Sequence, residues 1–339
     1  MAGLSQEALA KKAGDITKQA ISKYERGKDT PSSGVLLRLA RALEVRPDWL
    51  LRPETVDIGQ IAFRRRRSMR QRELDRIAYR VRDEVERYLM LERIVLGPHA
   101  NECHIPKSVE KARSVDQAEE AAEKLRAVWG LGVYPIANLT AILEEQGVRV
   151  IGIDGSKDFD GLSAWADGKI PIIVVGADWP GDRQRFTLAH ELGHLLIERA
   201  DESREDEKWA QRFAGAFLIP RQAAYDVLGE HRRNLTFEEL YSLKHAFGVS
   251  MACWVYRATD LGIISQWYAR SLWREFGKRK WRRKEPGKQV ASEKPTRLQR
   301  LLHRALADGV ISESRAAELA GISLREFHQQ WQARSCVPA

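Results

Sequence analysis

Hydrophobic positions recur along most of this chain with the period of an α-helix. Apolar residues three and four positions apart on otherwise polar segments predict amphipathic helices. The long helix over 69–91 is strongly charged, which indicates a spacer or a dimer element. The predicted helices lie at 5–13, 17–25, 36–43, 49–51, 69–91, 118–131, 137–146, 186–197, 205–219, 235–247 and 253–261, and a further helical pattern covers 296–331.

Three segments have the character of β-strands instead. Residues 148–153 and 170–175 are predominantly apolar, which predicts buried strands, and residues 160–166 predict a third strand with Gly168 at the turn that follows it. Strands followed by helices are typical of an α+β domain. By analogy with other folds of this kind, the sheet edge near Leu162 to Ala166 is expected to pair with an extended peptide.

Length and composition favour several folded units of a globular protein. The chain has 339 residues, 43% of them hydrophobic and 30% charged, which exceeds one ordinary core. It contains no run of eighteen apolar residues and no charged-then-apolar leader, so we expect no membrane partner and a cytoplasmic location. The three cysteines are too scattered for a disulfide framework and are expected to be ordinary thiols.

The net charge of +9 favours an anionic partner. Much of the positive charge is concentrated in two clusters, at 64–72 and 278–284. A basic run is more often a solvated face or a linker than a phosphate track, so these clusters only support the argument.

The first thirty residues have the layout of a helix-turn-helix. Ser5 is placed to cap a first helix, Gly14 and Asp15 interrupt that helix, and Thr17 is placed to cap a second one. Outward-facing amide, hydroxyl and ammonium groups on the second helix suit base edges and phosphates in the major groove. A double-stranded DNA operator is the predicted partner, and the predicted DNA-contacting residues are Gln6, Thr17, Lys18, Gln19, Ser22, Lys23 and Lys28.

This region resembles the Cro/CI-type (XRE) DNA-binding domain over residues 4–52. The resemblance rests on the runs 4–10, 19–27 and 30–32, which read Leu-Ser-Gln-x-x-Leu-Ala, Gln-x-Ile-Ser-x-x-Glu-x-Gly and Thr-Pro-Ser. The family normally has a further amphipathic helix before the first run, so its first helix is expected to be missing here. A generic helical bundle used for dimerisation is the alternative, and the turn and closing motifs argue against it.

The run His190-Glu191-x-x-His194 predicts a metal site on the helix over 186–197. Two imidazoles four residues apart lie on one helix face, about 6 Å apart along the axis, and can reach one ion. Glu191 is placed beside the metal, where a carboxylate can act as the general base for an attacking water. This set of residues predicts a zinc-dependent peptidase.

A catalytic zinc needs a third protein ligand and an open position for water. Glu198 is about 12 Å along the same helix from His190 and cannot converge on the same ion. The helix over 205–219 places Glu207 one turn before small residues that allow close packing, so Glu207 is the predicted ligand. Glu205 and Asp206 are second choices.

The chain from Arg183 to His194, followed by Glu207 to Pro220, resembles the ImmA/IrrE metallo-endopeptidases of bacteria and phages. The resemblance implies that His190, His194 and Glu207 bind zinc and that Glu191 is the catalytic base. Trp209 and Gln211 depart from the pattern of many relatives, and we expect neither of them to touch the ligands.

These features predict a multidomain fold. An all-α helix-turn-helix domain of XRE type occupies 1–55, a charged helical spacer 56–110, an α+β zincin-like metallopeptidase domain 111–285, and a linker with a small helical C-terminal domain 286–339. Residues 311–323 again have the pattern of a helix, a glycine turn and a second helix. Because that second helix looks short, we expect a packing or interaction role there rather than a second DNA-binding unit.

The predicted function is a DNA-binding transcriptional regulator with a zinc-dependent endopeptidase domain. The family resemblance implies a protein substrate, an XRE-type repressor whose cleavage controls a stress response or a mobile element. The alternative is a non-proteolytic regulator or antitoxin whose peptidase-like domain senses a ligand or binds a partner, and a homodimer is compatible with both. An intact Glu191 favours activity, and Tyr225, His231 and Lys244 are candidates for stabilising an oxyanion.

Overall fold

The computed structural model describes residues 4–43, 45, 47–51, 62–65, 71–101, 103–106, 115–155, 159–196, 204–282 and 284–335. The chain divides into two compact units, one comprising Met1–Asp57 with Ser68–Glu86 and the other Ile58–Arg67 with Arg87–Ala339. The predicted fold class is confirmed: a helical N-terminus, an α+β region and a helical C-terminus follow one another. None of the helices in these described ranges has the length and apolar character needed to span a bilayer.

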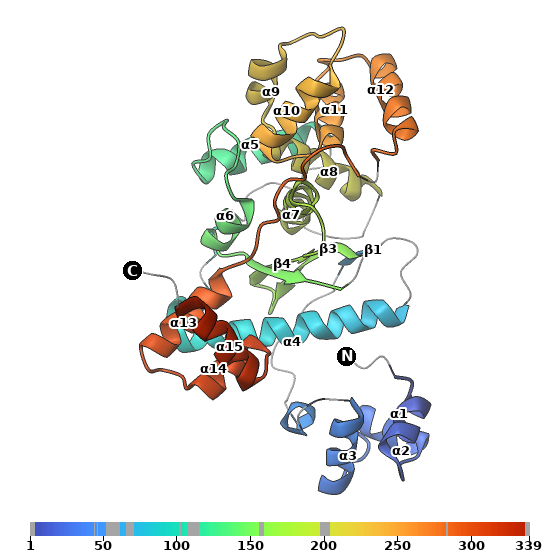
Figure 1. Ribbon diagram of the computed structural model, residues 1–339, viewed down its shortest axis with the longest axis vertical. Helices are drawn as coiled ribbons and strands as arrows, with labels where there is room; N and C mark the ends of the chain where they lie inside the picture. The colour runs from blue at the N-terminus through green and yellow to red at the C-terminus, as the bar shows by residue number, and fades with distance from the viewer. Residues whose placement is uncertain are drawn as a thin grey trace. The chain divides into compact units, whose positions relative to one another are not determined.

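The N-terminal unit is built on short capped helices. The hydroxyl of Ser5 accepts a hydrogen bond from the backbone of Ala8, and that of Thr17 accepts one from Ala20, so both helices begin where the sequence predicts. Gly14 turns the chain between them at φ 65°. The elements are α1 (Gln6–Ala13), α2 (Lys18–Glu25), α3 (Ser33–Leu43) and the 3-10 helix η1 (Pro47–Leu51), and their buried core contains Leu9, Ala13, Ile21, Leu39 and Ala42 (Figure 1).

The segment between the N-terminal helices and the sheet differs from the predicted helical spacer. Helix α4 (Gln71–Leu96) is longer than predicted, and η2 (Gly97–Asn101) follows it. Within the same segment, β1 (Ala62–Arg65) is a strand that the periodicity did not indicate, because its arginines looked like a linker. The rest of the predicted basic cluster before residue 71 lies outside the described residues.

A four-stranded sheet forms the centre of the second unit. Its other strands are β2 (Arg149–Ile153), β3 (Phe159–Ala166) and β4 (Ile170–Gly176), in the order β1-β3-β4-β2. Strands β2 and β4 run parallel, whereas β3 is antiparallel to both of its neighbours. The three predicted strands are confirmed. The expectation of an open edge along β3 is wrong over Gly161 to Ser163, because β1 of the same chain pairs there.

Helix α7 (Gly181–Leu196) lies on one face of this sheet, and Figure 1 shows it between the strands and the helices that follow. It contacts β3 and β4 on one side and α8 (Arg204–Leu218) on another, and α8 in turn packs on α5 (Val115–Val128). Ile173 and Val175 of β4 point towards this helical layer and join its hydrophobic core. The remaining helices of the layer are α6 (Leu139–Glu145), α9 (Arg221–Leu228), α10 (Phe237–Phe247), α11 (Met251–Asp260) and α12 (Gln266–Lys278).

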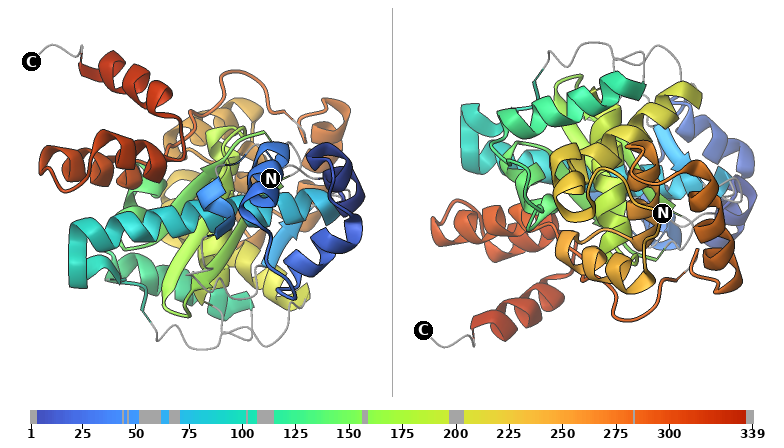
Figure 2. Two further views of the ribbon diagram at one scale, coloured as in Figure 1. Left: turned by 90° about the horizontal axis from the view of Figure 1, so that it is seen from below. Right: turned by 90° about the horizontal axis from the view of Figure 1, so that it is seen from above.

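Three helices close the chain. They are α13 (Arg297–Ala307), α14 (Glu313–Ala320) and α15 (Leu324–Ser335), and their buried residues include Leu302, Ala305, Ala316, Leu319 and Phe327. In both views of Figure 2 these red helices form a group to one side of the sheet. The predicted helical pattern over 296–331 is confirmed, although α15 extends further than that pattern did.

A buried lysine holds the helical layer together. The ammonium of Lys244, fully buried, lies 2.7 Å from a carboxylate oxygen of Asp182 on α7 and 2.8 Å from one of Glu285. Burial alone would lower the pKa of Lys244, but the hydrogen bonds from its ammonium to the two carboxylates raise that pKa above its usual value. Glu285 also accepts hydrogen bonds from the first backbone N–H groups of α11, those of Met251 and Ala252. The structure therefore gives Lys244 a packing role, and its interpretation as an oxyanion stabiliser is wrong.

We expect Lys244→Met to lower the free energy of unfolding by about 3–5 kcal/mol, because it leaves two carboxylates buried without their cation. Lys278→Met is the matched control: Lys278 is paired with Glu275 at the surface and should contribute less than about 1 kcal/mol. Denaturant midpoints followed by circular dichroism measure both. Equal midpoints for the two variants would contradict the assigned role of Lys244.

Candidate metal centre

The two histidines of the predicted motif lie on α7, which is buried nearly all round. Burial follows from its sequence, because apolar residues surround the motif on most sides. At its start, Arg185 is held by Glu293 at 2.8 Å and donates to the backbone carbonyl of Phe247 at 2.9 Å. These ionic and hydrogen-bonded contacts fix the helix along its axis, so the positions of its side chains are set before any ion binds.

Two imidazole nitrogens and one carboxylate oxygen converge at the α7–α8 contact. Nε2 of His190 lies 3.0 Å from Nε2 of His194, and an Oε2 atom of Glu207 lies 3.4 Å from the first and 3.5 Å from the second. Tetrahedral zinc with bonds of about 2.0–2.1 Å places its ligands roughly 3.4 Å apart. The two separations that involve Glu207 match this spacing and the separation of the two imidazole nitrogens is shorter, so the three groups are a candidate site for one zinc ion.

The group opens towards solvent on one side only. The exposed fraction of the side chain rises from 0% at His190 to 13% at His194 and 41% at Glu207. An ion held by these three residues would be screened by α7 and accessible from the α8 side. That arrangement leaves room for a fourth ligand such as water or a substrate oxygen.

Glu191 faces β3 rather than solvent. Its carboxylate accepts a hydrogen bond of 2.8 Å from the hydroxyl of Ser163, and the side chain is 1% exposed. Gly161 permits this approach, since a Cβ there would lie 2.5 Å from Thr187 and 3.4 Å from Glu191. The motif did not reveal Ser163 or Gly161. The alternation of β3, which places both residues on the face towards α7, is the signal that could have found them.

One residue predicted to stay clear of the ligands does contact them. The side-chain amide of Gln211 donates to the second carboxylate oxygen of Glu207 at 3.3 Å, one helical turn away. Trp209 points elsewhere and stacks on Phe213 with ring centroids 5.4 Å apart. Gln211 is therefore placed to orient Glu207, as outer partners of metal ligands commonly do.

The other candidates from the sequence do not join this group. Of the acidic residues at the start of α8, Glu207 is the one whose carboxylate meets the two imidazoles, while Glu205 is exposed. Glu198 lies outside the described residues. The hydroxyl of Tyr225 donates to the carbonyl of Leu261 at 3.5 Å, and His231 is exposed beyond α9.

The predicted DNA-contacting residues gather around α2. Thr17, Lys18, Gln19, Lys23 and Lys28 are exposed, whereas Ser22 and Gln6 are half-buried. The Gln6 amide donates to Glu25 of α2, and the Thr17 hydroxyl serves as the helix cap. An exposed helix that carries lysines, an amide and hydroxyls matches the surface expected of a recognition helix.

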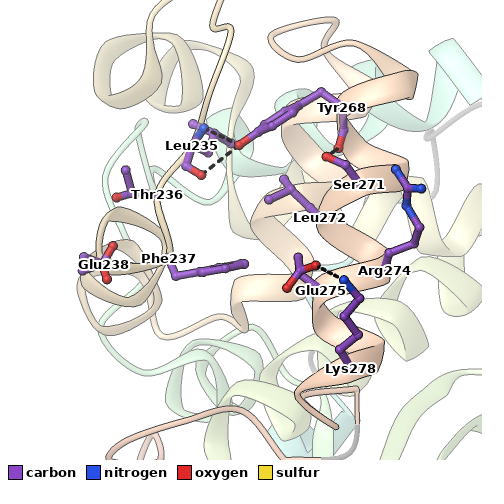
Figure 3. Close-up of a pocket in the computed structure, with 10 residues that line it drawn as sticks. All are labelled: Leu235, Thr236, Phe237, Glu238, Tyr268, Ser271, Leu272, Arg274, Glu275 and Lys278. Carbon is purple, nitrogen blue, oxygen red and sulfur yellow. Dashed lines mark hydrogen bonds and ion pairs between the residues drawn. The ribbon is translucent and has the colours of Figure 1, made fainter.

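Figure 3 shows a surface hollow of about 680 Å³ between the start of α10 and α12. Phe237 and Leu272 line it together with charged residues of α12, and none of its lining residues belongs to the metal group. Beside it, the Arg279 guanidinium lies over the rings of Phe237 and Trp281, each 4.9 Å away. Part of the 278–284 basic cluster is therefore used in local packing.

Comparison with known families finds matches for two regions of the chain. Residues 1–50 match the family described as Helix-turn-helix, and residues 143–259 match the IrrE N-terminal-like domain of the peptidase families. No curated protein matches the chain. The two resemblances predicted from the sequence are confirmed, so the chain combines an XRE-type DNA-binding domain with an ImmA/IrrE-like domain.

The spacing of α7 and α8 gives a direct test of the metal centre. A Cβ on Gly193 would lie 3.0 Å from a ring carbon of Phe213 and 3.4 Å from the backbone of Ala210, so α8 must move by a few tenths of an ångström. We expect Gly193→Ala to weaken zinc affinity several-fold by displacing Glu207, measured by competition with a chromophoric chelator.

Gly215→Ala on α8 is the control, because nothing lies within 4 Å of its Cβ position. It should leave zinc affinity unchanged and stabilise the helix by roughly 0.5–1 kcal/mol. Equal zinc affinities for Gly193→Ala and the unaltered protein would argue against a metal centre at this contact.

Proposed function

We propose that this DNA-binding regulator is a zinc-dependent endopeptidase whose substrate is a repressor of XRE type. The observation that carries the proposal is the convergence of His190, His194 and Glu207 within zinc-ligand spacing, with the buried Glu191 next to His190 in sequence. Control of a stress response or a mobile element is the expected physiological setting. Because DNA is the partner of the first domain, we place its action in the cytoplasm.

The residues divide the work between binding and proton transfer. His190, His194 and Glu207 would hold the ion, and zinc in such a site supplies a Lewis acid that polarises a carbonyl and lowers the pKa of water. The carboxylate of Glu191 would take a proton from the attacking water and return that proton to the leaving amine. The Ser163 hydroxyl positions that carboxylate, and Gln211 positions Glu207.

The DNA-binding half gives the protein an operator of its own. Lys18, Gln19 and Lys23 stand exposed on α2, where amide and ammonium groups reach base edges and phosphates. With both domains in one chain, the same protein would bind its operator and act on its substrate. A homodimer would match a two-fold symmetric operator.

The pairing of β1 with β3 favours a second candidate function. Residues 62–65 of the chain itself occupy the edge where a peptide could add as a strand. In that candidate the peptidase-like domain does not cut and instead senses zinc or binds a partner or toxin, so that the protein acts as a regulator or an antitoxin.

New protein N-termini in host cells separate the two functions. Cells expressing the unaltered protein are compared with cells expressing Glu191→Gln, with and without DNA damage and at matched protein levels. Glutamine keeps the contact with Ser163 but cannot act as a base, so zinc content should stay at one per chain while a cleaved repressor fragment disappears.

Glu205→Gln makes the same change at an exposed position of α8 and should leave the fragment in place. His194→Ala should abolish both the fragment and stoichiometric zinc. If no N-terminus depends on Glu191 while zinc is bound and promoters still respond, the peptidase proposal is wrong and the sensor remains.

A further inference from the structure

We propose that α13, α14 and α15 form a second DNA-binding unit, which reads double-stranded DNA with the exposed face of α15. From the sequence, residues 311–323 were expected to have a packing or interaction role, because the second helix of this segment looked short. In the structure α15 has 12 residues, against 8 in α2. The second helix is therefore not short, and its length no longer argues against a DNA-binding role.

The turn between α14 and α15 repeats the construction of the turn between α1 and α2. An alanine stands four positions before a glycine of positive φ in both, with Gly321 at 72° and Gly14 at 65°. The next helix then begins at a hydroxyl cap, Ser323 or Thr17, which accepts from a backbone N–H three residues on. Two helices joined by a tight glycine turn are the core of a helix-turn-helix.

The buried and exposed positions of the two second helices correspond when they are counted from the cap. Four residues after the cap, Phe327 is buried in α15 as Ile21 is in α2. Ser323 and Glu326 form a reciprocal capping box, with the carboxylate accepting from the Ser323 backbone at 2.9 Å. α15 is thus a strongly initiated helix that buries Phe327.

The outer side of α15 carries groups that recognise bases. Arg325 and Gln329 stand two and six positions after the cap, where α2 has Gln19 and Lys23, and all four are exposed. Arginine pairs with guanine and glutamine with adenine in the major groove. His328 is also exposed and contacts Glu313 at 2.9 Å.

Attachment and charge are compatible with DNA on this face. Arg87 of α4 donates to the carbonyl of Leu319 at 3.1 Å, so α14 takes part in the contact between this group of helices and α4. Residues 297–335 contain six arginines and four carboxylates, a net charge of +2, compared with nine basic and six acidic residues, a net of +3, over 4–51. The two units present duplex DNA with similar excess positive charge.

The test uses the full chain and duplexes selected by it from a random-sequence 40-bp pool, with affinities from fluorescence anisotropy. We expect Arg325→Ala/Gln329→Ala to weaken binding to the selected duplexes about tenfold and to erase one of two motifs in a repeated selection. The matched control is Gln266→Ala/Arg270→Ala, an exposed pair at the same spacing on α12, which should change neither.

Because a misfolded variant would also lose binding, a second variant is designed to bind DNA more tightly. Gln329→Lys adds a cation to the same face and should strengthen binding to a non-selected duplex at low salt, with a steeper dependence of affinity on salt. The proposal is overturned if both α15 variants bind and select as the unaltered chain does, while Lys18→Ala/Lys23→Ala removes all binding. That result would leave α15 as a surface for protein contacts.

Discussion

The contact between α7 and α8 at Gly193 sets the geometry of the candidate metal centre. Two of its three side chains come from one helix and the third from the other, so their spacing depends on the spacing of the two backbones. With no side chain at Gly193, α8 approaches until Phe213 and Ala210 are in contact, and Glu207 then reaches both imidazoles. Because the interface is tightly packed, the distance between α7 and α8 cannot change freely. The three donor atoms therefore keep a nearly fixed spacing.

Charge pairs inside the protein hold that interface in register. Arg257 lies against Glu119 of α5 and also donates to the carbonyl of Ile219, just after α8, while Arg212 of α8 contacts the same Glu119 at 3.1 Å. Burial works against the ionised form of Glu119, yet its arginine partners lower its pKa below the usual value. The carboxylate therefore stays charged at neutral pH, and the ion pairs that fix α8 persist.

Local patterns in the sequence identify the helices and three strands well, because capping residues and apolar spacing act over a few positions. Thr17, Gly168 and the His190 motif are of this kind. Strand β1 is different: its arginines gain a strand conformation only from pairing with β3, nearly a hundred residues away. The alternation of β3 could place Ser163 on the face towards α7, but its hydrogen bond to Glu191 and the contact of Gln211 with Glu207 depend on tertiary packing that the sequence does not show.

The strand β1 also bears on where the IrrE-like domain could be separated from the rest of the chain. A fragment beginning at residue 143, where the family match starts, would keep α7 and α8 but lose β1, exposing the unpaired backbone edge of β3. It would also lose Glu92, whose carboxylate lies 3.0 Å from the buried guanidinium of Arg149. Open strand edges recruit other strands, and a buried unpaired charge is costly. The compact unit that holds this domain is therefore larger than the region of the family match, and it is discontinuous in sequence.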